Sequence, residues 1–261
     1  MPNVCPLIDL FFKDESSWTK RAEKIADCGY SAVETWGGSD PVMLKAISAS
    51  GVKLASIVMV FADEAGIVPV NPANRQAFLE RIDRYMDNAL AAGCPQGIVT
   101  AGQQVTGLSH THQRSVLTEN LALAGELAAR RGFSLNLEPL NTEVDHAGYF
   151  LSDPAEAVSI VKETGCANVN VLYDIYHMAI MRGNHAEFLL YNIDRIGHFH
   201  VAGVPGRHEP AGGETNYPRL LEVIEKSGYK GYVGLEYFPL LESRASLTET
   251  KNYFSSAVKS W

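Results

Sequence analysis

The sequence predicts a single α/β domain, a (β/α)8 or TIM barrel, that spans residues 1–261. Strand-like and helix-like segments alternate from one end of the chain to the other, with eight of each, which is typical of stacked βα units. A glycine ends most helical segments, and the next strand begins within a few residues. One barrel of this kind commonly has about 250 residues, and no linker or low-complexity tract marks a second domain.

Each element is placed by its own pattern. The predicted strands are short apolar runs at 4–10, 32–36, 53–60, 97–101, 134–139, 169–174, 196–201 and 232–237. The predicted helices have helical spacing of apolar residues, at 16–28, 40–50, 71–92, 110–131, 153–165, 184–192, 217–228 and 243–258. Capping residues before proline mark three helix starts, at Asp40-Pro41, Asn71-Pro72 and Asp153-Pro154. An open doubly wound sheet is disfavoured, because no glycine-rich phosphate loop follows the first strand.

Composition narrows the class of function. The net charge of −8 argues against a nucleic-acid partner or an anionic membrane surface. The four cysteines are widely spaced, which favours reduced thiols in a cytoplasmic protein. The N-terminal run has no basic segment and reads as a strand, and no apolar run approaches the roughly 20 residues of a membrane helix. We expect a cytoplasmic enzyme that acts on a small molecule, with a homo-oligomer possible.

Four polar residues at the ends of apolar runs are the main functional signal. They are Glu138 in SLNLEPLN, Asp174 in VNVLYDIYH, His200 in IGHFHVAG and Glu236 in GYVGLEYFP. Strand alternation turns all four inward, and consecutive barrel strands are neighbours, so they can converge. Three carboxylates and one imidazole suit Mn²⁺, Mg²⁺ or Co²⁺. The alternative is four unrelated strand ends, although an inward carboxylate must be paired, protonated or metal-bound.

Several segments resemble a known family. They are LEPLNTEVDHAGYFL (137–151), YDIYHM (173–178), the run 196–239 and, more weakly, GYSAVETW (29–36). The chain resembles the hydroxypyruvate isomerase family of the xylose isomerase-like barrel superfamily over its whole length. This resemblance implies metal ligands at Glu138, Asp174, His200 and Glu236. It also implies substrate contacts from His177 and Arg207, the latter on the long loop 202–216.

The implied activity is that of a metal-dependent intramolecular oxidoreductase. A member of this family would interconvert hydroxypyruvate and tartronate semialdehyde, or a close 2-oxo acid or sugar, through a cis-enediolate. We expect Glu138 and Glu236 to ligate the metal and also to transfer protons, because paired carboxylates suit this chemistry. Asp174 would be a ligand only.

Two other activities stay open at this point. The first is that of a ketose 3-epimerase, and His200 supports it. Hydroxypyruvate isomerases carry glutamine at this third ligand position, in HLQIA or HVQIA, whereas ketose 3-epimerases carry histidine. A histidine expected in the third strand is also absent from ASIVMVF. A metal-dependent hydrolase of the AP endonuclease-like type is a further alternative, against which the acidic charge counts. A protein that binds metal and sugar without turnover is a fourth reading.

Several residues near the predicted site have two possible roles. His177 is either a substrate contact or a loop-capping histidine. Arg207 either binds a substrate carboxylate or pairs with Glu209 or Glu214 of its own loop.

His198 is expected to be a hydrogen-bonded residue of the interior rather than a ligand. Glu34 is placed to hold His198 or another group behind the ligands, and a direct catalytic role for Glu34 is the alternative. Aromatic residues that could wall the pocket or simply pack are Trp36, Phe11 and Phe12.

Overall fold

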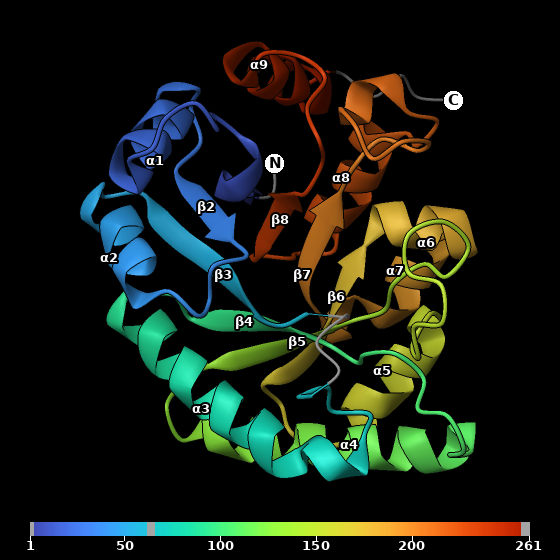
Figure 1. Cartoon of the computed structure of the whole chain (residues 1–261). Coiled ribbons are helices and arrows are strands. Elements are labelled where there is room, and N and C mark those ends of the chain that lie inside the picture. The colour runs from blue at the N-terminus through green and yellow to red at the C-terminus, as the bar shows by residue number, and fades with distance from the viewer. Residues whose placement is uncertain (1–2, 62–65, 257–261) are drawn as a thin grey trace.

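The computed structural model describes residues 3–61 and 66–256, which form a nearly closed barrel of parallel strands (Figure 1). The strands are β1 (Asn3–Pro6), β2 (Ala32–Thr35), β3 (Lys53–Val60), β4 (Gln96–Thr100), β5 (Ser134–Glu138), β6 (Val169–Asp174), β7 (Ile196–Val201) and β8 (Tyr232–Leu235). They pair in the order β1-β8-β7-β6-β5-β4-β3-β2. A single bridge between Leu7 and Glu34 links the two ends of the sheet. The predicted (β/α)8 barrel is confirmed.

Helices surround the strands on the outside (Figure 1). They are α1 (Trp18–Asp27), α2 (Pro41–Ala49), α3 (Arg75–Ala91), α4 (His110–Ala129), α5 (Pro154–Glu163), α6 (Ile175–Met181), α7 (His185–Asn192), α8 (Tyr217–Lys226) and α9 (Ser243–Phe254). None of the helices in the described ranges is long and apolar enough to cross a membrane.

The structure differs from the predicted elements at three places. The first strand ends at Pro6, and a 3₁₀ turn, Ile8–Leu10, follows it. Asn71 caps a separate 3₁₀ turn, Pro72–Asn74, and α3 begins only at Arg75. Helix α6 was not predicted at all. The end of the predicted helix 243–258 lies beyond the described residues.

The alternation of side chains in the strands separates the core from the site. In β5 and β7 the outward residues Leu135, Leu137, Phe199 and Val201 are fully buried in the layer between strands and helices. Burying each such side chain is worth about 1.5–3 kcal/mol, which fixes the register, because a shift by one residue would turn the apolar set inward. The polar residues at alternate positions therefore face the interior of the barrel.

A buried histidine at the start of α7 makes stability depend on pH. Nδ1 of His185 lies 2.9 Å from the hydroxyl of Tyr173, and burial lowers the pKa of His185 from 6.5 to about 4. Between these values the unfolded chain binds a proton that the folded chain does not. His185 therefore contributes about 3 kcal/mol to the free energy of unfolding. This contribution is complete above pH 6.5 and is lost as the pH falls from 6.5 to 4.

We expect His185→Gln to remove this dependence. Urea unfolding of the wild type and the variant between pH 4 and 7 measures it, and the gap between the two free energies of unfolding should narrow as the pH falls. A gap that stays constant with pH would contradict the assignment to His185.

Candidate metal centre and active site

Strand register brings the four predicted ligands together. Asp174 is paired with His200 between β6 and β7, and His200 is paired with Gly234 between β7 and β8. Glu138 is the last residue of β5, and Glu236 follows β8 directly. One ligand atom from each of the four side chains lies within 4.8 Å of all the others, and all four residues are buried. The structure confirms that they converge, while their role as metal ligands stays a prediction.

Three buried atoms of this cluster lack a hydrogen-bond partner within the described part of the chain, namely Oε1 of Glu138 and both ring nitrogens of His200. Oε1 of Glu138 and Nδ1 of His200 are 3.6 Å apart. Leaving such atoms unpaired costs about 1–3 kcal/mol each. A divalent cation among the four side chains would satisfy Oε1 of Glu138 and Nδ1 of His200, and carboxylate oxygens with an imidazole are a suitable donor set. The donor atoms of these four side chains are therefore suited to bind a divalent metal ion.

The electrostatics of the cluster show an excess of negative charge. Burial raises the pKa of Asp174 to about 7, against the opposing effect of Arg207 and His200. Burial also raises the pKa of Glu236, but Arg207 and His200 outweigh it and hold that pKa well below its usual range. The carboxylates thus compete for the positive charge of Arg207 and His200, and a bound cation would remove this competition.

Arg207 reaches this cluster from the loop after β7. Its Nη2 is 2.5 Å from Oε2 of Glu236 and 3.8 Å from Oδ2 of Asp174. The backbone of Arg207 is in the left-handed region, with φ of 58°, and its carbonyl accepts from the N–H of Phe238 at 2.8 Å. A side chain held this way over a buried acidic site is positioned rather than free, which fits a functional role.

Arg207 pairs with Glu236 rather than with Glu209 or Glu214, the acidic residues of its own loop that were the alternative partners. Glu209 accepts hydrogen bonds from the backbone N–H groups of Leu240 and Leu241. Nε of Arg207 is buried and has no hydrogen-bond partner among residues 3–61 and 66–256. The guanidinium therefore keeps a donor available for a bound molecule.

His177 lies in the unpredicted helix α6. The carboxylate of Asp174 caps this helix by accepting from the N–H of Tyr176 at 2.8 Å. Nδ1 of His177 is 2.7 Å from Nδ2 of Asn141, which donates, and Nε2 is 3.4 Å from Oδ2 of Asp174. Burial, followed by the charge of Arg207, holds the pKa of His177 well below its usual range. The neutral ring therefore presents an Nε2–H donor to the site, which argues against a mere loop cap.

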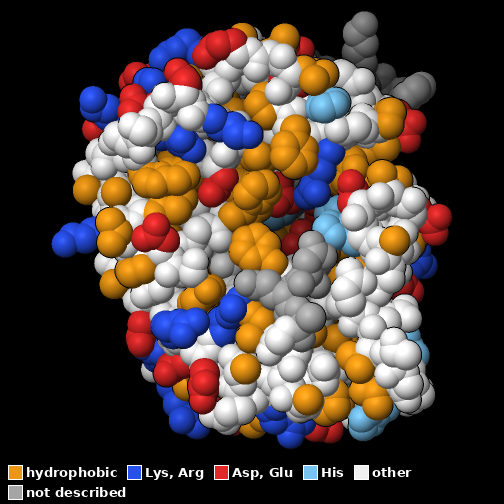
Figure 2. Space-filling view, in the orientation of Figure 1, with side chains coloured by type: hydrophobic (Ala, Val, Ile, Leu, Met, Phe, Trp, Pro, Cys, Tyr) orange, Lys and Arg blue, Asp and Glu red, His pale blue; other side chains and the backbone are white. Residues whose placement is uncertain are grey.

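A cavity of about 300 Å³ opens onto these groups. Figure 2 shows acidic, basic and histidine side chains in the hollow of this face, edged by hydrophobic ones. Nε1 of Trp36 donates to Oε1 of Glu236 at 2.9 Å, so Trp36 walls the site, which is the first of its two interpretations. Phe11 and Phe12 pack in the core instead. The lining residues are Trp36, Val58, Phe61, Thr100, Glu138, Leu140, His146, His177, Arg207, Glu236 and Phe238.

Five lining residues were not identified from the sequence, namely Val58, Phe61, Thr100, Leu140 and Phe238. Thr100 is the last residue of β4 and pairs with Glu138 in the sheet, so the rule that found the other strand ends could have found it. Val58 lies within β3, and the other three follow strands in loops, where periodicity gives no signal.

Comparison with known proteins identifies the family. A family model described as xylose isomerase-like TIM barrel matches residues 22–253. The chain belongs to this family.

Curated relatives of this xylose isomerase-like barrel are isomerases. 2-Oxo-tetronate isomerase of Cupriavidus necator is 39% identical over 192 residues, which cover 74% of this chain and 73% of that one. Hydroxypyruvate isomerase of Escherichia coli is 33% identical over 241 residues, which cover 89% and 92%. A crystal structure named AP endonuclease, family 2, from Brucella melitensis superposes with a TM-score of 0.89 at 29% identity, over 97% and 99% of the two chains. The predicted family and the predicted isomerase class are confirmed.

Proposed function

We propose that this chain is a divalent-metal-dependent isomerase of hydroxypyruvate or a close 2-oxo acid such as 2-oxo-tetronate. The observation that carries the proposal is the buried set of three carboxylates and one imidazole, with two unpartnered atoms facing each other, beside a guanidinium in one cavity. The names of relatives at 33–39% identity support the substrate class.

Four residues would hold the metal, namely Glu138, Asp174, His200 and Glu236. Their donors suit Mn²⁺ or Mg²⁺, with Co²⁺ possible, and the imidazole favours Mn²⁺ and Co²⁺ over Mg²⁺. When bound, the cation supplies Lewis acidity to the carbonyl and the adjacent hydroxyl of the substrate.

The proton transfers fall to the two glutamates. One removes a proton from the hydroxymethyl carbon of hydroxypyruvate, which gives a cis-enediolate, and a proton returns to the former carbonyl carbon. The hydroxyl proton of the hydroxymethyl group moves to the former carbonyl oxygen, and the product is tartronate semialdehyde. Trp36 orients the carboxylate of Glu236 through its indole N–H.

The remaining polar groups would hold the substrate. The Nε2–H of His177 is available to donate to a substrate oxygen, because Asn141 occupies its Nδ1. Arg207 would receive the carboxylate of the substrate in a planar fork. Aromatic side chains at the mouth, such as Trp36 and Phe238, would limit access of water to the reacting carbon.

We expect Arg207→Lys to raise KM for hydroxypyruvate by about tenfold or more, because lysine cannot make both bonds of the fork. Neutral ketoses should be affected less. Steady-state kinetics with Mn²⁺ measures both, and Arg219→Lys is the matched control, since Arg219 pairs with Glu222 on the surface. Equal losses for acidic and neutral substrates would contradict a carboxylate-binding role.

A ketose 3-epimerase is the second candidate, and His200 favours it. It predicts that the wild type prefers neutral ketoses to hydroxypyruvate and that Arg207→Lys has no effect. The substrate profile of the wild type therefore separates the two candidates.

The proposed function is tested by assaying 2-oxo acids and ketoses with Mn²⁺ in deuterium oxide. Product should appear from hydroxypyruvate or 2-oxo-tetronate, with solvent deuterium at the carbon that receives the proton. Binding without any deuterium incorporation would indicate a non-catalytic protein. Incision of abasic DNA in a parallel assay would instead support the hydrolase alternative.

A further inference from the structure

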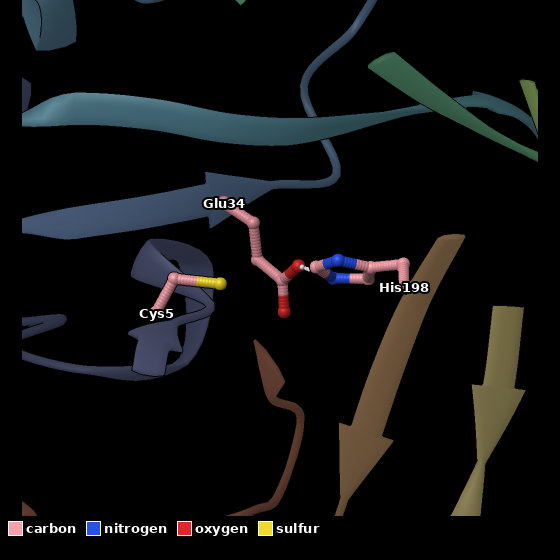
Figure 3. A group of neighbouring side chains, drawn as sticks. All are labelled: Cys5, Glu34 and His198. Atoms are coloured by element: carbon pink, nitrogen blue, oxygen red, sulfur yellow. Dashed lines mark hydrogen bonds and ion pairs between the residues drawn. The ribbon is translucent and has the colours of Figure 1, made fainter. Parts of the chain in front are cut away.

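A second group of buried polar side chains lies inside the barrel beside the candidate metal centre. Figure 3 shows Glu34, from β2, between Cys5 and His198, with its carboxylate facing the imidazole. Oε2 of Glu34 is 2.7 Å from Nε2 of His198, and Oε1 is 3.3 Å from Nε2 of His200. Each of these side chains is at most 2% exposed. One carboxylate therefore faces two imidazoles, one of which belongs to the candidate metal centre.

The tautomer of His198 follows from its neighbours. Oε1 of Gln96 accepts from Nδ2 of Asn136 at 3.1 Å, so the amide NH₂ of Gln96 is the group that lies 3.3 Å from Nδ1 of His198. Because Nδ1 accepts, Nε2 carries the ring proton and donates it to Glu34. Oε2 of Glu34 is thus occupied. Oε1 of Glu34 and Nε2 of His200 are 3.3 Å apart as an ion pair without hydrogen-bond geometry, and neither atom has a hydrogen-bond partner within the described residues.

Glycine at position 234 provides the space for this arrangement. A Cβ on Gly234 would lie 2.0 Å from Oε1 of Glu34 and 2.6 Å from Cδ2 of His200. Strand pairing puts Gly234 beside Cys5 on one side and His200 on the other. Any other residue at this position would separate the carboxylate from the imidazole.

We propose that Glu34 is a positioning residue, which holds His200 with its proton on Nε2 so that the lone pair of Nδ1 faces the metal site. Nδ1 of His200 lies 3.1 Å from Oε2 of Glu236 and 3.6 Å from Oε1 of Glu138, on the side away from Glu34. A ligating imidazole needs one unprotonated nitrogen, and a carboxylate on the other nitrogen fixes both tautomer and ring orientation. The inference rests on the proposed function only in taking His200 as a ligand.

A metal held by Cys5, Glu34 and His198 themselves is the rival interpretation, because their donor atoms lie within 4.8 Å of one another. Hydrogen bonding disfavours it. Nε2 of His198 is used by Glu34 and Nδ1 by Gln96, so the ring has no lone pair for an ion.

Mn²⁺ affinity of the purified protein tests the positioning role. Glu34→Gln should weaken Mn²⁺ binding by about 10–100-fold, because one amide cannot accept from both imidazoles. Cys5→Ala is the matched control, which removes the third neighbour but leaves both imidazole contacts, and its affinity should equal that of the wild type. Unchanged binding in Glu34→Gln would overturn the proposal. So would a second Mn²⁺ per wild-type chain that Cys5→Ala loses.

The ring protons give a readout that does not depend on the metal or on the folding of a variant. In wild-type protein with ¹⁵N-labelled histidine, ring-to-backbone correlations assign each imidazole. Nε2 of His200 should carry a proton that exchanges slowly with water, in the presence or absence of Zn²⁺. An unprotonated Nε2 overturns the proposal. If the wild type bound no Mn²⁺, the proposed metal dependence would fail, while this spectrum would still decide the role of Glu34.

Discussion

Replacing Glu138 or Glu236 by glutamine is expected to lower turnover by at least about 10²-fold, because each change removes a general acid or base. The amide is of the same size and its oxygen can still ligate, so metal content should fall less than turnover. Stopped and continuous assays with saturating Mn²⁺, together with metal analysis of the same samples, measure both quantities.

Glu163→Gln is the matched control for these two variants. Its carboxylate pairs with Arg114 on the surface, so its loss should leave turnover unchanged. Exchange of substrate protons with deuterium oxide adds a second criterion, since a proton carrier is needed for exchange as well as for net reaction. Near-normal turnover in Glu138→Gln or Glu236→Gln would reject that residue as a proton carrier.

Replacing Asp174 by asparagine is expected to abolish tight metal binding, because the N–H of Tyr176 holds the amide oxygen and the NH₂ group, which cannot ligate, takes the place of Oδ2. The wild type should hold one divalent ion per chain, and the ion should stabilise the fold by about 3 kcal/mol when it is present at 100 times its Kd. Asparagine can still accept the hydrogen bond from Tyr176 that begins α6, so the helix cap survives while the charge is lost.

Metal analysis and thermal unfolding with and without Mn²⁺ measure this effect. Asp174→Asn should lose both the ion and the metal-dependent rise in Tm. Asp153→Asn is a suitable control, because Asp153 caps α5 in the same way but lies on the surface. A wild type without metal, or an Asp174→Asn variant with unchanged metal content and activity, would refute the site.

The alternation of strand and helix patterns predicted the fold reliably, because a barrel repeats the same βα unit along the whole chain. Period-two alternation in β5 and β7 showed which residues face inward, and the polar ends of the runs marked the site. Parallel strands in sequence order leave little freedom, so four residues on strands 5 to 8 had to meet at one end of the barrel.

Helix α6 could not be predicted from periodicity. It has seven residues, IYHMAIM, which carry no helical periodicity and continue the apolar run of β6. Only the hydrogen bond from Tyr176 to Asp174 shows that the chain turns into a helix there. Consequently His177 was identified through the family resemblance, and its Nε2–H donor was visible only in the structure.

The sequence by itself determined the barrel, the inward faces of its strands and the four residues that converge on the candidate metal centre, because these follow from periodicity and chain order. Tertiary structure decided which of them are paired and in which direction the pKa values of Asp174 and Glu236 shift. The contacts of Glu34 with His198 and His200 cross the barrel from β2 to β7, more than 160 residues apart. No local pattern specifies such a contact, since it depends on how far each side chain reaches into the shared interior and on the space that Gly234 leaves.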